Sequence, residues 1–322
     1  MNIIQGIRTL LHEVDEAVFP SNIYCLCCGS LIDESRLYSI CDFCMERMHW
    51  ITGPTCARCG KALRPRTGGE EDGSAAAADG AAGSAAAADG SPGAGGRLCY
   101  DCLRSEHLFL RGFSCVTYGL HEREIMMDLK YGGMGYIAAK CGDMMFDRME
   151  GEIRFGLLSP GRHPVDLVVP VPVSEERLRR RGYNQSAWMA RQLVRRWQAF
   201  AREEGEELPS PAERSTGGCG RTGAGKDTRC HAPVLLDALE RAKATKMLRS
   251  LSPAERALEL RDAFRVKASF RGRLAGKGIL LIDDIYTTGA TADACSRALL
   301  EGGASEVILL AWASGGNRRP TE

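Results

Sequence analysis

The sequence predicts an α/β protein, a doubly wound and mostly parallel sheet that carries an N-terminal Cys-rich zinc-binding module. Two observations predict this class. Short apolar runs alternate with helical patterns from about residue 108 to residue 316, which is typical of a parallel sheet with helices on both faces. Before that region, eight of the fourteen cysteines form four C-x-x-C pairs. The formal net charge is only +1, so no global basic field points to nucleic acid.

Residues 1–24 are expected to form an amphipathic helix. Its apolar positions lie on one stripe, and Pro20 ends the pattern. Acidic residues interrupt these positions and no small-residue cleavage site follows, so we do not interpret the segment as a signal peptide. No apolar stretch reaches the roughly 18–20 residues that a membrane span needs. We therefore expect a cytoplasmic protein without a membrane partner, whose first helix packs on its own chain.

Residues 25–107 are expected to form the zinc module. Without a secretory signal, paired C-x-x-C sequences favour zinc in a reducing compartment over disulfides. The two-residue spacing lets both thiolates of a turn reach one tetrahedral ion. Sequential pairing of the four C-x-x-C units is the simplest arrangement, but cross-braced pairing, or a single occupied site, uses the same ligands. We expect one or two structural zinc ions. The predicted ligands are Cys25, Cys28, Cys41, Cys44, Cys56, Cys59, Cys99 and Cys102.

Two low-complexity inserts interrupt the chain. The first, about residues 64–96, contains the octamer GSAAAADG twice, and the second covers about residues 205–231. Because both would bury little apolar surface, we expect them to be disordered. A third zinc site from cysteines and a histidine in the second insert has loose spacing and is not favoured. The remaining cysteines are expected to pack as small apolar side chains: Cys27, Cys115, Cys141 and Cys295.

The region from 108 to 316 reads as alternating strands and helices. Apolar runs bounded by turn residues predict the strands, and apolar positions at helical spacing predict the helices. In chain order we expect a strand at 113–118, helices at 122–130 and 137–149, a strand at 166–171, helices at 184–200 and 253–260, a strand at 279–282, a helix at 292–300 and a strand at 307–312.

The strongest candidate functional residues follow the strand that begins at Gly278. Its four apolar residues lead into two adjacent carboxylates, Asp283 and Asp284. In open α/β sheets, ligands bind at this carboxyl end of the strands. The small-residue loop that follows opens a helix, whose positive end favours a phosphate. The candidate anion loop comprises Thr287, Thr288, Gly289, Ala290 and Thr291. Carboxylates beside an anion loop suit a sugar phosphate, because they can accept hydrogen bonds from sugar hydroxyls.

A second candidate segment follows the strand at 166–171. It reads P-V-S and then R-L-R-R-R-G-Y-N-Q-S, and it places arginines near the carboxyl end of a strand. Guanidinium groups match phosphate oxygens in pairs, so pyrophosphate or substrate binding is favoured over a solvated basic helix face. Asn184 is also placed to cap the next helix. The candidate residues are Val173, Arg180, Arg181, Gly182, Asn184, Gln185 and, from an earlier segment, Lys130.

The acidic-pair segment resembles the phosphoribosyl-pyrophosphate (PRPP) motif of type I phosphoribosyltransferases. In that family the acidic pair contacts the ribose hydroxyls and the loop holds the 5′-phosphate. The whole set of motifs resembles the ComF/GntX family. The set comprises the Cys module, L-K-Y at 129–131, P-V-P at 170–172, R-x-R-R-G-Y-N-Q ending at Gln185, L-S-x-x-E-R at 251–256 and the acidic-pair loop. Two departures from the family's usual residues are Leu248, in place of Gln, and Glu259, in place of Asn.

The resemblance implies a type I phosphoribosyltransferase-like fold that binds PRPP or a related ribose phosphate with Mg²⁺. It also implies a link to natural competence, in which incoming single-stranded DNA is processed. If the protein is an enzyme, Asp283 and Asp284 are the catalytic residues. A second interpretation is a PRPP- or nucleotide-sensing adaptor, whose zinc module recruits a partner such as a competence helicase.

A third interpretation is a zinc module that binds single-stranded DNA. The arginine cluster would assist it, together with Arg58, Lys61 and the aromatic residues of the module. These are few for a stacking platform: Tyr24, Phe43, Trp50 and Tyr100.

Overall fold

The computed structural model describes residues 23–33, 35–64, 96–132, 135–154, 165–203, 232–242, 259–260 and 262–316. The predicted N-terminal helix, the interiors of both predicted inserts and most of the predicted helix at 253–260 lie outside these ranges. The helices are η1 Leu37–Ser39, α2 Asp42–Arg47, α3 Tyr100–Arg104, α4 Leu120–Tyr131, α5 Gly135–Arg154, α6 Glu175–Arg181, α7 Gln185–Glu203, η3 Ala268–Phe270 and α10 Ala290–Glu301. The strands are β1 Arg111–Thr117, β2 Leu167–Pro170, β3 Val234–Leu235, β4 Leu239–Arg241, β5 Phe264–Val266, β6 Gly278–Tyr286 and β7 Glu306–Ser314.

A five-stranded sheet organises the described residues, in the order β1-β7-β6-β2-β3. Every neighbouring pair in it is parallel. A separate antiparallel pair, β4 and β5, lies outside this sheet. The predicted α/β class, a mostly parallel sheet with an N-terminal Cys-rich module, is therefore confirmed.

The strand β6 lies at the centre of the sheet and is apolar on both faces. Leu280 and Ile282 pack into one core cluster, and Ile279 and Leu281 pack into the other. This is the alternation expected of a strand covered by helices on both sides. The continuous apolar run that predicted the strand is thus explained by its position in the sheet.

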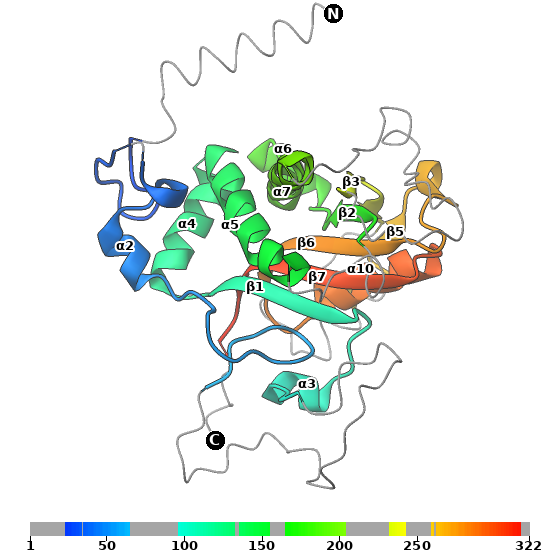
Figure 1. Ribbon diagram of the computed structural model, residues 1–322. Coiled ribbons are helices and arrows are strands. Elements are labelled where there is room, and N and C mark those ends of the chain that lie inside the picture. The colour runs from blue at the N-terminus through cyan, green and yellow to red at the C-terminus, as the bar shows by residue number, and fades with distance from the viewer. Residues whose placement is uncertain are drawn as a thin grey trace, which may run out of the picture.

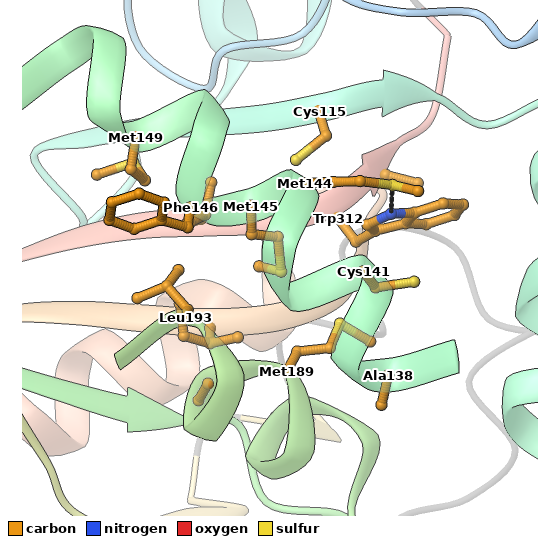
Figure 2. Packing of buried hydrophobic residues seen from close by; sticks show 14 of the residues in the cluster. Cys115, Ala138, Cys141, Met144, Met145, Phe146, Met149, Met189, Leu193 and Trp312 are labelled. Carbon is orange, nitrogen blue, oxygen red and sulfur yellow. Dashed lines mark hydrogen bonds between the residues drawn. The ribbon is translucent and has the colours of Figure 1, made fainter. Parts of the chain in front are cut away.

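One face of the sheet is covered by α4, α5 and α7, which Figure 1 shows together on one side of the strands. Figure 2 shows the contact region, where methionines of α5 and α7 fill the space above β7. The indole Nε1 of the buried Trp312 donates a hydrogen bond to the Met144 sulfur at 3.1 Å. Unbranched methionine side chains adapt to the irregular gap between a large indole and the helices. Cys115 and Cys141 pack in this core as predicted.

The opposite face is covered by α10 and by the β4–β5 pair. Cys295 and Leu299 of α10 pack with Ile279 and Leu281 of β6 in the second core cluster. The fully buried Cys295 occupies the apolar role that its sequence context predicted.

The segment between the first two and the last two C-x-x-C pairs lies along the outer edge of β1. The amide of Ile51 donates to the Cys115 carbonyl at 2.9 Å, and that of Thr117 donates to the His49 carbonyl at 2.8 Å. Farther along, the Gly112 amide donates to the Arg58 carbonyl at 2.8 Å. Backbone groups of the exposed strand edge are thereby paired, which removes a site of unwanted strand addition.

Most of the elements predicted from periodicity are present. The strands at 113–118, 166–171, 279–282 and 307–312 correspond to β1, β2, β6 and β7, and the helices at 122–130, 137–149, 184–200 and 292–300 correspond to α4, α5, α7 and α10. The short elements α6, β3, β4 and β5 were not predicted.

Candidate functional site

The acidic pair lies at a topological switch point of the sheet. Strands β2 and β6 are neighbours, but β2 continues into α7 on one face, whereas β6 continues into α10 on the other. Chain connections leaving a pair of strands in opposite directions define the place where open α/β sheets bind ligands. The Val171 amide donates to the Ile282 carbonyl at 2.9 Å, so the loop after β2 begins beside Asp283.

The two carboxylates of the pair differ in their surroundings. Asp284 forms an ion pair with Lys130 of α4, with 2.7 Å between Nζ and Oδ2. Burial alone would raise the pKa of Asp284, but the Lys130 ammonium, the Ile285 amide and Arg181 together outweigh burial and hold that pKa below its ordinary value. Asp283 is buried, and burial together with the neighbouring Asp284 charge raises its pKa well above the ordinary value. The site therefore holds one stabilised carboxylate beside one that favours its neutral form.

The candidate anion loop turns sharply into α10. Gly289 precedes the helix with a φ of 89°, in the left-handed region that favours glycine. The helix begins at Ala290, two residues before the predicted start at residue 292. Thr287 is exposed, and Thr288 and Thr291 are half-buried. All five predicted loop residues thus lie together between β6 and α10.

A histidine that the sequence analysis did not identify supports this loop from behind. The buried His107 contacts the loop helix through its Nδ1, which lies 2.8 Å from Oδ2 of Asp293. Its Nε2 lies 3.3 Å from the Tyr286 hydroxyl. A Cβ added at Gly289 would lie 2.5 Å from Cε1 of His107. The histidine ring therefore occupies the space that any larger residue at position 289 would need.

The arginine-rich segment forms a short helix, α6. The Ser174 hydroxyl caps it by accepting the Arg177 amide at 3.3 Å, and Gly182 ends it with a φ of 78°. Ser174 and the two glutamates that follow are a helix-start signal that the sequence carried. Val173 is half-buried in the loop between β2 and α6.

The residues after α6 anchor the segment to the end of β2. The Asn184 amide group donates to the Val171 carbonyl at 3.0 Å, and its Oδ1 accepts the Ala187 amide at 3.4 Å, which caps α7 as predicted. The Tyr183 hydroxyl donates to the Leu129 carbonyl, next to Lys130 in α4. These bonds join the end of β2 to the two segments that carry the predicted cations, α4 and α6.

The predicted phosphate-binding side chains divide into exposed and buried groups. Arg180 is exposed and Arg181 is half-buried, and their guanidinium carbons lie 5.6 and 5.3 Å from the centre of the Tyr131 ring. Arg181 also contributes to the lowered pKa of Asp284. Gln185 is buried at the start of α7. Within the described part of the chain, Arg181 Nε and Gln185 Nε2 are buried without a hydrogen-bond partner.

The eight predicted zinc ligands form two four-cysteine groups, with the sequential pairing. The first comprises Cys25, Cys28, Cys41 and Cys44, and the second comprises Cys56, Cys59, Cys99 and Cys102. A tetrahedral zinc with Zn–S bonds of about 2.3 Å separates its sulfurs by about 3.8 Å. The sulfur–sulfur separations are 3.7 Å for Cys28–Cys41 and 3.6 Å for Cys59–Cys99. The donor sets and their spacing therefore fit structural zinc.

Two residues expected to assist DNA binding are engaged elsewhere. The Lys61 side chain is only 4% exposed, and its Nζ lies 2.6 Å from the Asp101 carboxylate. Arg58 donates to the His107 carbonyl. Both cations are therefore engaged within the protein, and the expectation that they assist DNA binding stays a prediction. Trp50 likewise donates its indole N–H to the Met45 carbonyl at 3.0 Å.

Some predictions concern residues outside the described ranges. These are the unfavoured third zinc site, with Cys219, Cys230 and His231, and the L-S-x-x-E-R segment at 251–256. They stay predictions. In the described part of the chain, no helix is both long and apolar enough to span a bilayer.

Fold and site together define an α/β protein with two four-cysteine zinc-ribbon groups and an acidic pair at the switch point of its sheet. Residues 14–78 match the family model "Double zinc ribbon domain". The chain is 24% identical over 297 residues to "Competence protein ComFC" of Bacillus subtilis (strain 168). The matched region covers 87% of this chain and 90% of that protein.

Two further relatives are similar to the chain over shorter stretches. "DNA utilization protein YhgH" of Escherichia coli (strain K12) is 24% identical over 209 residues, covering 65% of this chain and 74% of that protein. "Competence protein F" of Haemophilus influenzae is 27% identical over 142 residues, covering 44% of this chain and 47% of that protein. The resemblance to the ComF family that the motifs predicted is confirmed.

Proposed function

We propose that this protein binds PRPP or a related ribose phosphate, with Mg²⁺, at the carboxyl ends of β2 and β6. The observation that carries the proposal is the position of Asp283 and Asp284 at the switch point, directly before a loop that ends at the N-terminus of α10. The carboxylates suit ribose hydroxyls, and the loop suits a 5′-phosphate. A site for phosphate alone would not need the two carboxylates, and a metal site alone would not need the anion loop.

The cations around the pair supply the complementary charge. Lys130 already neutralises Asp284, and Arg181 lies close enough to lower its pKa. Buried polar atoms without partners are rare in folded proteins, so the unpartnered Nε of Arg181 and Nε2 of Gln185 call for a further acceptor. Pyrophosphate oxygens are acceptors of the right kind.

If the protein is a phosphoribosyltransferase, its residues act mainly by electrostatics. Asp283 and Asp284 would orient the ribose and lie near the positive charge that develops at its C1 atom. Mg²⁺, bound by pyrophosphate and ribose oxygens, would stabilise the leaving pyrophosphate. The arginines of α6 would hold the pyrophosphate as it departs.

A non-catalytic, ligand-sensing adaptor is the alternative that the same site supports. The predicted binding side chains around the acidic pair are Lys130, Arg181, Asn184 and Gln185, which offer charge and hydrogen bonds. A group that would activate an acceptor nucleophile is not among them. Release of pyrophosphate on addition of nucleobases would favour the transferase, and tight binding without turnover would favour the adaptor.

We further propose that the protein acts in competence or DNA utilization, as the names of its relatives indicate, or in nucleotide metabolism, and that it works in the cytoplasm. None of the cysteines in the described part is disulfide-bonded, which suits a reducing compartment. A competence helicase is the proposed protein partner. Two cation–aromatic pairs on the ribbons, the exposed Phe43 with Arg47 and the half-buried Tyr100 with Arg104, favour single-stranded DNA as a further ligand. A steep salt dependence of oligonucleotide affinity would test it.

The deciding experiment is calorimetric titration of the zinc-loaded chain with PRPP and Mg²⁺. The Asp283→Asn/Asp284→Asn double variant is the site variant. Glu306→Gln is the control, because Glu306 begins β7 beside Gly278, at the end of the strands opposite to the acidic pair. We expect binding by the wild type and the control but not by the double variant. Equal affinity in all three proteins would overturn the assignment, and so would absence of binding in the wild type.

A further inference from the structure

A third cluster of metal-ligating side chains lies outside both four-cysteine groups. It joins Cys27 of the first zinc ribbon to His121 and Glu124 of α4. The ligand atoms of the three residues all lie within 4.8 Å of one another. Figure 1 shows the N-terminal ribbon, with α2, beside α4, so the cluster lies where the ribbon meets the α/β domain.

The local structure explains why the three side chains meet. Cys25 and Cys28 belong to the first four-cysteine group, whereas the buried thiol of Cys27, between them, contacts His121 of α4 and also Cys44 of that group. His121 and Glu124 are three residues apart in a helix, a spacing that places both side chains on one face. Cys27 is 8% exposed, His121 is half-buried and Glu124 is exposed. The cluster is thus closed on the thiol side and open on the carboxylate side.

The distances match those of a tetrahedral zinc site. The Cys27 sulfur lies 3.5 Å from Nδ1 of His121 and 3.9 Å from Oε2 of Glu124. Zinc bonds of about 2.3 Å to sulfur and about 2.1 Å to nitrogen or oxygen place such ligand atoms about 3.6 Å apart. The corresponding sulfur–sulfur distances in the two four-cysteine groups are 3.6 and 3.7 Å. The third cluster therefore has spacing similar to that of the two four-cysteine groups.

We propose that Cys27, His121 and Glu124 form a third zinc site with three protein ligands and an open fourth position. Structural zinc sites have four protein ligands, whereas sites with three hold water or an exchangeable ligand in the fourth position. The exposed Glu124 side of the cluster leaves room for such a ligand. The site does not depend on PRPP binding. It would join the ribbon to the first turns of α4, the helix whose last turn carries Lys130.

The alternative is a thiol that only donates a hydrogen bond to the His121 ring or the Glu124 carboxylate. The two arrangements differ in metal content, which makes the choice measurable. A further alternative is that Cys27 replaces Cys28 as a ligand of the first four-cysteine group. In that case zinc binding by Cys27 would need neither His121 nor Glu124.

The test is the zinc content of the full chain, measured by elemental analysis after equilibration with zinc and removal of the free ion. We expect three zinc ions per chain in the wild type. The His121→Ala/Glu124→Gln variant and the Cys27→Ser variant should each hold two. Arg123→Ala is the control, since Arg123 is exposed on the same helix, and it should hold three.

Cobalt substitution provides a second measurement, which also reports whether the variant still folds around the two four-cysteine groups. The visible bands of cobalt bound by four thiolates should persist in the Cys27→Ser variant, while the weaker bands of a one-thiolate site disappear. Two zinc ions in the wild type and in the double variant alike would overturn the proposal. So would loss of zinc in Cys27→Ser without loss in His121→Ala/Glu124→Gln, because Cys27 would then belong to the first four-cysteine group.

Discussion

At the scale of single residues, the acidic pair combines opposite contributions to stability. Asp284 is stabilised by the Lys130 ammonium, whereas Asp283 is a buried carboxyl whose pKa is raised by burial and by its neighbour. A buried group that disfavours its own charge lowers the stability of the folded state at neutral pH.

The two aspartates should therefore respond in opposite directions to the same substitution. Asp284→Asn leaves Lys130 without its partner and should lower the free energy of unfolding by about 1–2 kcal/mol at pH 7. Asp283→Asn removes a buried carboxyl whose ionisation is unfavourable, while Asn can still accept the Asp284 amide, so the free energy of unfolding should rise by about 1 kcal/mol. Urea denaturation of the two variants and the wild type would measure both changes. A loss of stability of similar size in both would contradict this account.

The gain from Asp283→Asn should depend on pH. The folded-state pKa of Asp283 is raised, so wild-type stability is full below the unfolded pKa of about 4 and falls as the pH rises through the folded pKa. The variant carries no titrating group at this position. Its advantage should consequently vanish near pH 4, the unfolded value, and grow as the pH rises above it, and an advantage that is constant with pH would exclude Asp283 as the cause.

Gly289 is the residue at which the shape of the loop is most restricted. Gly289→Ala should lose about 1–2 kcal/mol from its left-handed backbone, and more because the new Cβ would lie 2.5 Å from the His107 ring. Gly272 has a similar φ of 78° and nothing within 4 Å of an added Cβ, so Gly272→Ala isolates the backbone cost. Guanidinium denaturation should show the larger loss for Gly289→Ala, accompanied by weaker PRPP binding. Equal losses would mean that His107 does not restrict the loop.

At the scale of elements, the second four-cysteine group is connected to the anion loop by a chain of contacts. Lys61 pairs with Asp101 of α3 and lies 5.4 Å from the centre of the Tyr286 ring. His107, which follows α3, contacts both Tyr286 and Asp293. The group therefore supports the segment from the end of β6 to the first turn of α10.

Loss of the second zinc should weaken PRPP binding more than loss of the first. Cys102→Ser and Cys28→Ser should each reduce the zinc content by one ion per chain. We expect Cys102→Ser to reduce PRPP affinity by about tenfold, a loss of about 1.4 kcal/mol, because the loop loses its support. Calorimetric titration of both variants measures the effect. Equal affinities would show that the chain of contacts transmits nothing to the loop.

The success of sequence prediction also differs by element. Strand β6 and its acidic pair were predictable because a buried central strand is apolar on both faces and the motif lies on contiguous residues. The four-cysteine groups were predictable because zinc imposes a short, repeated spacing. His107 was not, since its partner Asp293 is 186 residues away and no local pattern marks either residue. The open cluster at Cys27 was missed for the same reason, as its other ligands are 94 and 97 residues away.

At the scale of the whole molecule, the two ribbons belong to different cores. Cys25, Leu26 and Ile40 of the first pack into the cluster below α4, α5 and α7. Cys56, Cys59 and Leu63 of the second pack into the cluster that contains α10. Strand order and this division arise from tertiary packing, so neither was accessible from local periodicity. The zinc groups are consequently part of the sheet's support on both faces.

Zinc removal should therefore destabilise the entire described fold instead of melting the ribbons alone. In calorimetric scans, the zinc-loaded chain should unfold in one main transition, because the ribbons and the sheet share their apolar clusters. A strong chelator should shift that transition to lower temperature, since ions bound only by the folded state stabilise it. Cys28→Ser and Cys102→Ser should each produce part of the shift. A main transition that stays in place after chelation, preceded by a small separate one, would show that the ribbons unfold independently of the sheet.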